Sequence, residues 1–165
     1  MTDDGVNACR YDGMASGGLL GGLIPTPMWG DPLSFVDPTG LDYVYQQSTG
    51  QMTHVDANGD ANNVGNGYAG HGPGVNNPAM QGVKNTGPLP QGTYTIGPQQ
   101  DNGKLKNSMR LTPDPTNNMF DRSRFLIHGP HANDHQDSSN GCPIFNKTIR
   151  DQIGNSGDRV LRVVP

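Results

Sequence analysis

The sequence predicts a mainly β fold with one short helix. Its apolar residues fall in short runs that are rich in β-branched and aromatic residues and are bounded by glycine or proline. The 165 residues include 24 glycines and 14 prolines. Hydrophobic content is low at 32%, but the net charge is only −4. Because turn residues separate these short apolar runs, we expect a loop-rich β domain rather than a disordered chain.

The first predicted element is a hairpin. Residues 41–47 alternate as a strand, Ser48-Thr-Gly50 turns the chain, and residues 51–56 return. Residues 56–77 are strongly polar and rich in Gly and Asn, so we expect a flexible loop. The oxygens of Asp56, Asn58 and Asp60 would suit a calcium ion, but the glutamate that ends an EF-hand loop is missing.

Four further strands and the helix follow. The strands are predicted at 93–96, 108–112, 123–128 and 159–164. The helix is predicted over 146–154, with Asn146 as N-cap and Gly154 as C-cap. Ile149 and Ile153 would lie on one face of this helix.

Charge and hydropathy exclude several classes of partner. A mildly acidic chain without a Lys/Arg cluster argues against a nucleic-acid partner. No apolar run approaches the roughly 20 residues that span a bilayer. The first residues lack the basic region of a secretory signal peptide, and residues 14–24 are interrupted by glycines. If the protein acts on the cell wall, we expect a dedicated apparatus to export it, or the chain to be part of a larger exported protein.

A histidine and a cysteine are candidates for nucleophilic catalysis. His128-Gly129 ends the apolar run Phe125-Leu-Ile, and Ser139-Asn140-Gly141-Cys142 follows one polar loop later. This spacing suits two strand ends that face each other, so that the imidazole lowers the thiol pKa and takes its proton. The carbonyl of Gly129 could fix the imidazole tautomer, and Gly129 could leave space for a substrate strand. Gly141 would let the backbone approach substrate, with the N–H groups of Gly141 and Cys142 directed at the oxyanion.

Other roles for these residues remain open at this stage. Cys142 could be a buried structural cysteine, or it could pair with Cys9 in a disulfide that would cap the proposed nucleophile. His128 could be an ordinary core histidine. A zinc ion could also be bound by His128 and Cys142, together with His131, Asp134, His135 and Asp137. The spacing of these six residues matches no closed zinc motif. We therefore expect neither a metal nor a cofactor, and we expect the loop histidines to form a lid.

Several motifs in order resemble the L,D-transpeptidase-like effectors of type VI secretion, a toxin branch related to L,D-transpeptidases. The signature is His-Gly, a loop and then Ser-x-Gly-Cys, and the similarity covers roughly residues 43–165. Two departures stand out, because Asn140 replaces the usual histidine before Gly-Cys and the Pro143-Ile144 region replaces the usual arginine after it. The other matching segments are Tyr68-Ala-Gly-His71, Asn76-Asn77-Pro78, Gly87-Pro-Leu-Pro-Gln-Gly-Thr-Tyr94, Arg110-Leu-Thr-Pro-Asp-Pro115 and Asp121-Arg-Ser-Arg-Phe125.

The resemblance implies an L,D-transpeptidase-like β-sandwich or barrel whose short helix follows the catalytic Cys142. It implies an antibacterial toxin that acts on peptidoglycan tetrapeptide stems in the periplasm of target bacteria. The activity would be L,D-carboxypeptidase, or L,D-transpeptidase exchange of terminal D-Ala for a D-amino acid acceptor. Its expected partners are a secretion apparatus and a cognate immunity protein.

Six residues are candidates for substrate binding. Arg122 and Arg124 could hold a substrate carboxylate, because residues two apart on a strand point to the same face; surface solvation is the alternative. His71 could line the substrate groove or could be an ordinary loop histidine. The full set is Tyr68, His71, Arg122, Arg124, Ser139 and Asn140.

Residues 1–42 are predicted to be a separate arm, and residues 43–165 the catalytic domain. The Gly/Pro-rich arm shows no sustained hydrophobic period. Its Asp37-Pro38-Thr39-Gly40-Leu41 resembles the junction between the core of Rhs-repeat proteins and their variable C-terminal toxins. The same residues also suit a β-turn, and both interpretations can hold.

Two other functions stay open on the sequence alone. One is a non-catalytic wall-binding or carrier module of an Rhs-type protein, in which the His/Cys pair is incidental. The other is a cysteine amidase that cuts elsewhere in the stem peptide.

Overall fold

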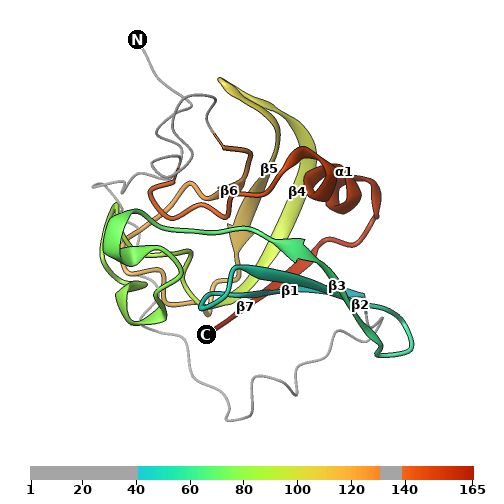
Figure 1. Ribbon diagram of the computed structural model, residues 1–165, viewed down its shortest axis with the longest axis horizontal. Helices are drawn as coiled ribbons and strands as arrows, with labels where there is room; N and C mark the ends of the chain where they lie inside the picture. Colours follow the sequence, from blue (N-terminus) through green and yellow to red (C-terminus); the bar gives the residue numbers. More distant parts are fainter. Residues whose placement is uncertain (1–40, 131–138) are drawn as a thin grey trace.

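The computed structural model describes residues 41–130 and 139–165. These residues form seven strands, one α-helix and two 3-10 helices (Figure 1). The strands are β1 (Asp42–Gln46), β2 (Gln51–Val55), β3 (Ala61–Asn66), β4 (Gly92–Asn102), β5 (Leu105–Pro113), β6 (Leu126–Ile127) and β7 (Val160–Val164). The helices are η4 (Gly72–Gly74), η5 (Pro78–Met80) and α1 (Lys147–Asn155). The predicted mainly β fold with one short helix after Cys142 is confirmed.

All seven strands belong to one sheet, in the order β3-β2-β1-β7-β4-β5-β6. Its centre is the parallel pair of β1 and β7, and every other neighbouring pair is antiparallel. Asp42 and Arg162 form a largely buried ion pair across this centre. The first and last strands of the described domain therefore hold the sheet together in its middle.

The two edges of the sheet are joined through Ile144. Tyr68, just beyond β3, forms an antiparallel bridge with Ile144, and His128, just beyond β6, forms a parallel bridge with the same residue. We call residues 142–145 the closing segment. Because it pairs with extensions of both edge strands, it turns the open sheet into a closed, barrel-like wall, in keeping with the expected sandwich or barrel.

A glycine permits this closure. A side chain at Gly67 would overlap the carbonyl oxygen of Ile144 and would crowd the ring of Phe145. The backbone before Tyr68 can therefore approach the closing segment only because position 67 lacks a Cβ atom.

The strand predictions hold for the hairpin and for three of the four later strands, which are longer or slightly shifted. Strand β6 is shorter than predicted and begins only at Leu126, since Arg124 adopts a left-handed conformation with φ of 69°. The loop predicted over 56–77 is wrong in part, because β3 pairs with β2 there. A carboxylate oxygen of Asp56 instead accepts from the backbone N–H groups of Asn58 and Asp60, which builds the connecting turn.

Helix α1 confirms the predicted N-cap. The side chain of Asn146 accepts a hydrogen bond from the N–H of Ile149 at 2.9 Å. Gly154 is not the C-cap, because the helix continues to Asn155 and Ser156 caps it. Gly154 instead lies against Gln99 of β4, where a Cβ atom would be 2.5 Å from the side-chain oxygen. A close helix–sheet contact thus explains this glycine.

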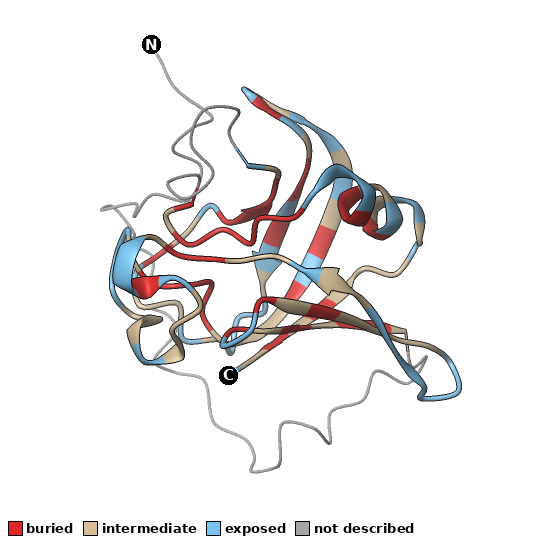
Figure 2. Cartoon of the chain, in the orientation of Figure 1, coloured by how far each residue is buried: buried red, intermediate tan, exposed pale blue. Residues whose placement is uncertain are grey.

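The core lies inside the curved sheet and under α1 (Figure 2). Ile149 and Ile153 pack into it from the helix, as the sequence predicts. Tyr45 meets Phe145 of the closing segment edge-to-face, with ring centroids 5.9 Å apart. Among residues 41–130 and 139–165, no helix is long and apolar enough to cross a membrane.

We predict that Gly67→Ala destabilises the fold by about 2 kcal/mol, because the new methyl group forces the closing segment away. Gly97→Ala is the matched control. Its Cβ atom would lie 3.3 Å from the nearest atom, so it should cost less than about 1 kcal/mol. Denaturant unfolding measures both changes. Equal stability of the two variants would contradict the account of the closure.

Candidate functional site

The closing segment brings the candidate nucleophile beside the candidate base. The N–H of His128 donates to the carbonyl of Pro143 at 3.2 Å, and the N–H of Phe145 donates to the carbonyl of His128 at 3.0 Å. This register places Ile144 opposite His128 and Cys142 two residues earlier. Cys142 and His128 therefore lie on neighbouring paired segments, with the Cys142 sulfur against the N–H of Leu126, two residues before His128.

Cys142 is fully buried, and its sulfur accepts a hydrogen bond from the N–H of Leu126 at 3.2 Å. Cys142 is disulfide-bonded, and its partner lies outside the described residues. A disulfide sulfur is no nucleophile, so any cysteine catalysis belongs to the reduced protein.

His128 is also buried, with 3% of its surface exposed. Its Nδ1 atom lies 2.8 Å from the carbonyl oxygen of Gly129, which is the contact expected from the sequence. Because a carbonyl can only accept, this hydrogen bond places the proton of a neutral imidazole on Nδ1. A neutral imidazole in this tautomer carries its lone pair on Nε2, the arrangement that a general base uses.

Ser139 fixes the turn that ends in Cys142. Its hydroxyl donates to the carbonyl of Cys142 at 2.7 Å and accepts from the N–H of Gly141 at 2.8 Å. The same oxygen accepts from the N–H of Gly70 at 3.2 Å, which ties the turn to the segment after Tyr68. The expectation that the Gly141 N–H points at an oxyanion is therefore wrong for this arrangement, since Ser139 already accepts from it.

Arg122 lies inside the molecule rather than at its surface. It is 3% exposed, and its guanidinium donates to four backbone carbonyls. These belong to Gln81, Pro88 at 2.8 Å, Gly87 at 2.8 Å and Asn140 at 3.1 Å. The prediction that Arg122 and Arg124 share a strand face is wrong, because neither lies on a strand and only Arg124 is exposed. In this arrangement Arg122 supports the backbone instead of meeting a substrate carboxylate.

The two site glycines make room for arginines, and their expected roles next to substrate stay predictions. At Gly141, where φ is 134°, a Cβ atom would collide with the guanidinium of Arg122. At Gly129 a Cβ atom would lie 2.6 Å from Nη2 of Arg150. Each glycine beside a candidate catalytic residue is therefore packed against a buried cation.

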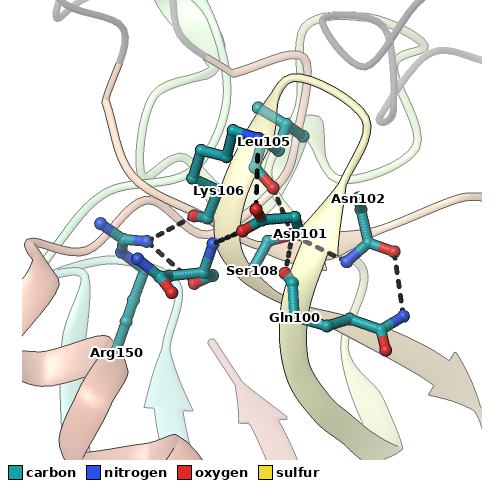
Figure 3. Close-up of polar contacts among 8 residues, drawn as sticks. Gln100, Asp101, Asn102, Leu105, Lys106, Ser108 and Arg150 are labelled. Atoms are coloured by element: carbon teal, nitrogen blue, oxygen red, sulfur yellow. Dashed lines mark hydrogen bonds and ion pairs between the residues drawn. The ribbon is translucent and has the colours of Figure 1, made fainter.

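Arg150 was missed by the sequence analysis. It follows Ile149 on α1 and is 8% exposed. Its Nε donates to the carbonyl of Phe145 at 3.0 Å. Its Nη1 donates to the carbonyls of Lys106 and Asn107 at 2.9 and 2.8 Å (Figure 3). Its position next to the apolar helix face was the only sequence signal, and that signal does not separate a buried arginine from a surface one.

The remaining predicted residues divide into two groups. Tyr68 bridges to Ile144, and the N–H of His71 donates to the carbonyl of Thr86 at 2.8 Å, so both lie on the segment tied to Ser139. Asn140 lies in the turn and offers its carbonyl to Arg122. Arg124 is exposed on the chain leading into β6. Substrate binding by these side chains stays a prediction.

The metal alternative rests on residues that the structure does not describe. His131, Asp134, His135 and Asp137 lie outside the described residues, as does the junction motif before Leu41. In the described part of the chain, no three His, Cys, Asp or Glu side chains cluster so as to hold a metal ion.

Comparison with known families identifies the chain. The Tlde1 domain model matches residues 63–163, which is more than half of the sequence. The chain belongs to the Tlde1-domain family. This is a family of type VI secretion effectors, and the match spans all the site residues described above. No curated protein and no solved structure shows a significant match to the chain.

We predict that Ser139→Ala destabilises this Tlde1-family protein by roughly 2 to 4 kcal/mol, because it leaves two buried N–H groups and a carbonyl without their partner. Ser123→Ala is the matched control. The Ser123 hydroxyl is buried and makes no hydrogen bond in the described structure, so its removal should be nearly neutral. Thermal or denaturant unfolding compares the two. A Ser139→Ala protein as stable as Ser123→Ala would show that the hydroxyl does not hold the turn.

Proposed function

We propose that this chain is a cysteine enzyme that acts on peptidoglycan tetrapeptide stems. The single observation that carries the proposal is the register of the closing segment. His128 pairs with Ile144, two residues after Cys142, and the carbonyl oxygen of Gly129 lies 2.8 Å from Nδ1 of the imidazole, which supports a base role for Nε2. The family match to type VI effectors supports an antibacterial role. Delivery by that apparatus, action in the periplasm of the target cell and a protective immunity partner belong to the same proposal.

The proposed reaction has two halves. Nε2 of His128 takes the thiol proton, and the Cys142 sulfur attacks the carbonyl carbon that joins the third stem residue to the terminal D-Ala. The C–N bond breaks, His128 returns the proton to the departing amine, and a thioester remains. Water or the amine of a D-amino acid then attacks the thioester, gives its proton to His128 and restores the thiol.

Two contacts position the proposed nucleophile. The N–H of Leu126 donates to the sulfur, and Ser139 holds the turn that precedes it. The Gly141 N–H does not serve the oxyanion in this scheme. Both Cys142 and His128 are buried, so the disulfide must be reduced and the site uncovered before substrate reaches the sulfur.

The burial and the disulfide favour one competing function. A cysteine that is fully buried and oxidised also fits a non-catalytic wall-binding or carrier module, in which the bond is structural. A cysteine amidase would share the same nucleophile but would cut a different bond. Product analysis separates all three.

The test is incubation of the reduced protein with purified tetrapeptide muropeptides, with and without D-methionine, followed by mass spectrometry. We predict loss of D-Ala in water and its replacement by D-methionine when that amino acid is present. Cys142→Ala should fold and convert nothing, because the sulfur is the attacking atom. Cys9→Ser, the matched thiol deletion, should keep full activity and should no longer need reductant.

Each alternative gives a different result. Conversion by a folded Cys142→Ala protein would contradict the proposed nucleophile. Cleavage at another stem bond would indicate the amidase, and no conversion by the reduced wild-type protein would indicate the non-catalytic module.

A further inference from the structure

Two buried arginines contact the segments that carry the site, and within the described residues neither forms an ion pair with a carboxylate. Within the described residues, every hydrogen bond of Arg122 and Arg150 goes to a backbone carbonyl. No ion pair involves either guanidinium in this part of the chain. Buried arginines are usually paired with a carboxylate. Two buried arginines that are held by backbone carbonyls alone therefore indicate a specific role.

Arg150 connects three elements behind His128. Its carbonyl partners lie in the closing segment, at Phe145, and on β5 at Lys106 and Asn107. The hairpin of β4 and β5 is itself held by Asp101, which accepts from the N–H of Asn107 at 3.0 Å (Figure 3). Phe145 in turn donates to the carbonyl of His128. A short backbone path thus links the guanidinium to the candidate base.

Arg122 likewise connects separate segments of the chain, next to Cys142. It joins the loop at 81–88 to the carbonyl of Asn140, two residues before the sulfur. Its guanidinium carbon also lies 5.1 Å from the centroid of the Phe125 ring, at the start of the strand that leads to His128. One cation therefore contacts the segments that carry both candidate catalytic residues.

Both cations remain charged at neutral pH. Burial lowers the pKa of Arg122 to about 10, and the nearby Tyr94 opposes that shift. Burial also lowers the pKa of Arg150, and the nearby Asp151 carboxylate opposes that shift. Charge in a poorly solvated site acts over several ångströms, and a cation favours a thiolate and disfavours an imidazolium. Both guanidinium groups are held by carbonyl dipoles, which leave their formal charge in place, whereas Asp151 offsets part of the Arg150 charge.

We propose that Arg122 and Arg150 are paired positioning residues, which set the Cys142 and Gly129 backbones and place two positive charges against the segments that carry the sulfur and the imidazole. The proposal rests on the roles assigned above to Cys142 and His128. The glycines at 129 and 141 are then required because each lets a guanidinium reach its segment. Lysine cannot replace these arginines fully, since a single ammonium cannot match the fork of donors.

The test measures ionisation directly and needs no turnover. In a reduced Cys9→Ser protein, Cys142 is the only thiol, and its titration is followed by the ultraviolet absorbance of the thiolate. NMR of the imidazole nitrogens reports the His128 tautomer. The variants are Arg122→Gln, Arg150→Gln, Arg122→Lys and Arg150→Lys. Arg110→Gln is the matched control, because it removes the same charge from an exposed position on β5.

We expect the Cys142 thiol pKa to lie below its ordinary value of about 8.5 in the parent protein. Each Gln substitution should raise it by about one unit. Arg150→Gln and Arg150→Lys should also weaken the preference for a proton on Nδ1 of His128, while Arg110→Gln leaves both readouts unchanged. The Lys variants at both sites should show smaller thiol shifts than the Gln variants, since they keep the charge and lose only the geometry.

Several results would overturn the proposal. One is a parent thiol pKa at or above about 8.5, which is readable even if every variant fails to fold. Another is a set of folded Gln variants whose thiol pKa and His128 tautomer match those of Arg110→Gln. Because these readouts need no substrate, they separate this proposal from the proposed function. If the Gln variants shift the Cys142 thiol pKa but the protein converts no muropeptide, the proposed enzymatic function is refuted and the positioning role stands.

Discussion

The structure depends on the double pairing of Ile144. Its N–H donates to the carbonyl of Tyr68 at 2.7 Å, and the N–H of Tyr68 donates back at 3.2 Å, while His128 pairs on the other side. Without this residue the sheet would keep two open edges, and the segments that carry Cys142 and His128 would have no common register. Barrel closure and assembly of the site are therefore one event. The short polar-flanked strands, each too weak to stand alone, gain their stability from that closure.

Side chains, rather than a regular strand ladder, hydrogen-bond many of the buried backbone groups of the closing segment. Residues 141–145 are all buried, so their backbone groups need partners that two isolated bridges cannot fully supply. Ser139 and Arg150 provide some of them, and Arg122 binds the carbonyl of Asn140 immediately before this stretch. This arrangement leaves the turn before Cys142 irregular, which is the backbone geometry that reactive residues commonly occupy. It also explains why glycine occurs at 67, 129 and 141, where an approaching carbonyl or guanidinium takes the space of a side chain.

Much of the fold could be read from local pattern, and much of the site could not. The first hairpin, the strands around Tyr94, Leu111 and Leu161, and the Asn146-capped helix follow from alternation, turn residues and capping chemistry. Strand β3 was missed because Asn62, Asn63 and Asn66 lack β propensity, and pairing with β2 overrides that preference. The hydrogen bond of His128 to Gly129 was expected because it lies between neighbours in sequence. The contacts of Arg122 and Arg150 span 18 to 44 residues, apart from one within the helix region, so no local pattern encodes them.

The central claim is that the closed barrel presents Cys142 as a nucleophile that attacks the stem peptide and becomes acylated. The most direct measurement is the intact mass of the reduced protein, mixed briefly with a tetrapeptide muropeptide and quenched in acid. The account predicts an adduct equal to the muropeptide less D-Ala, released by hydroxylamine as a thioester and mapped to Cys142. Muropeptide conversion without any adduct on Cys142, or with the adduct on another residue, would contradict it.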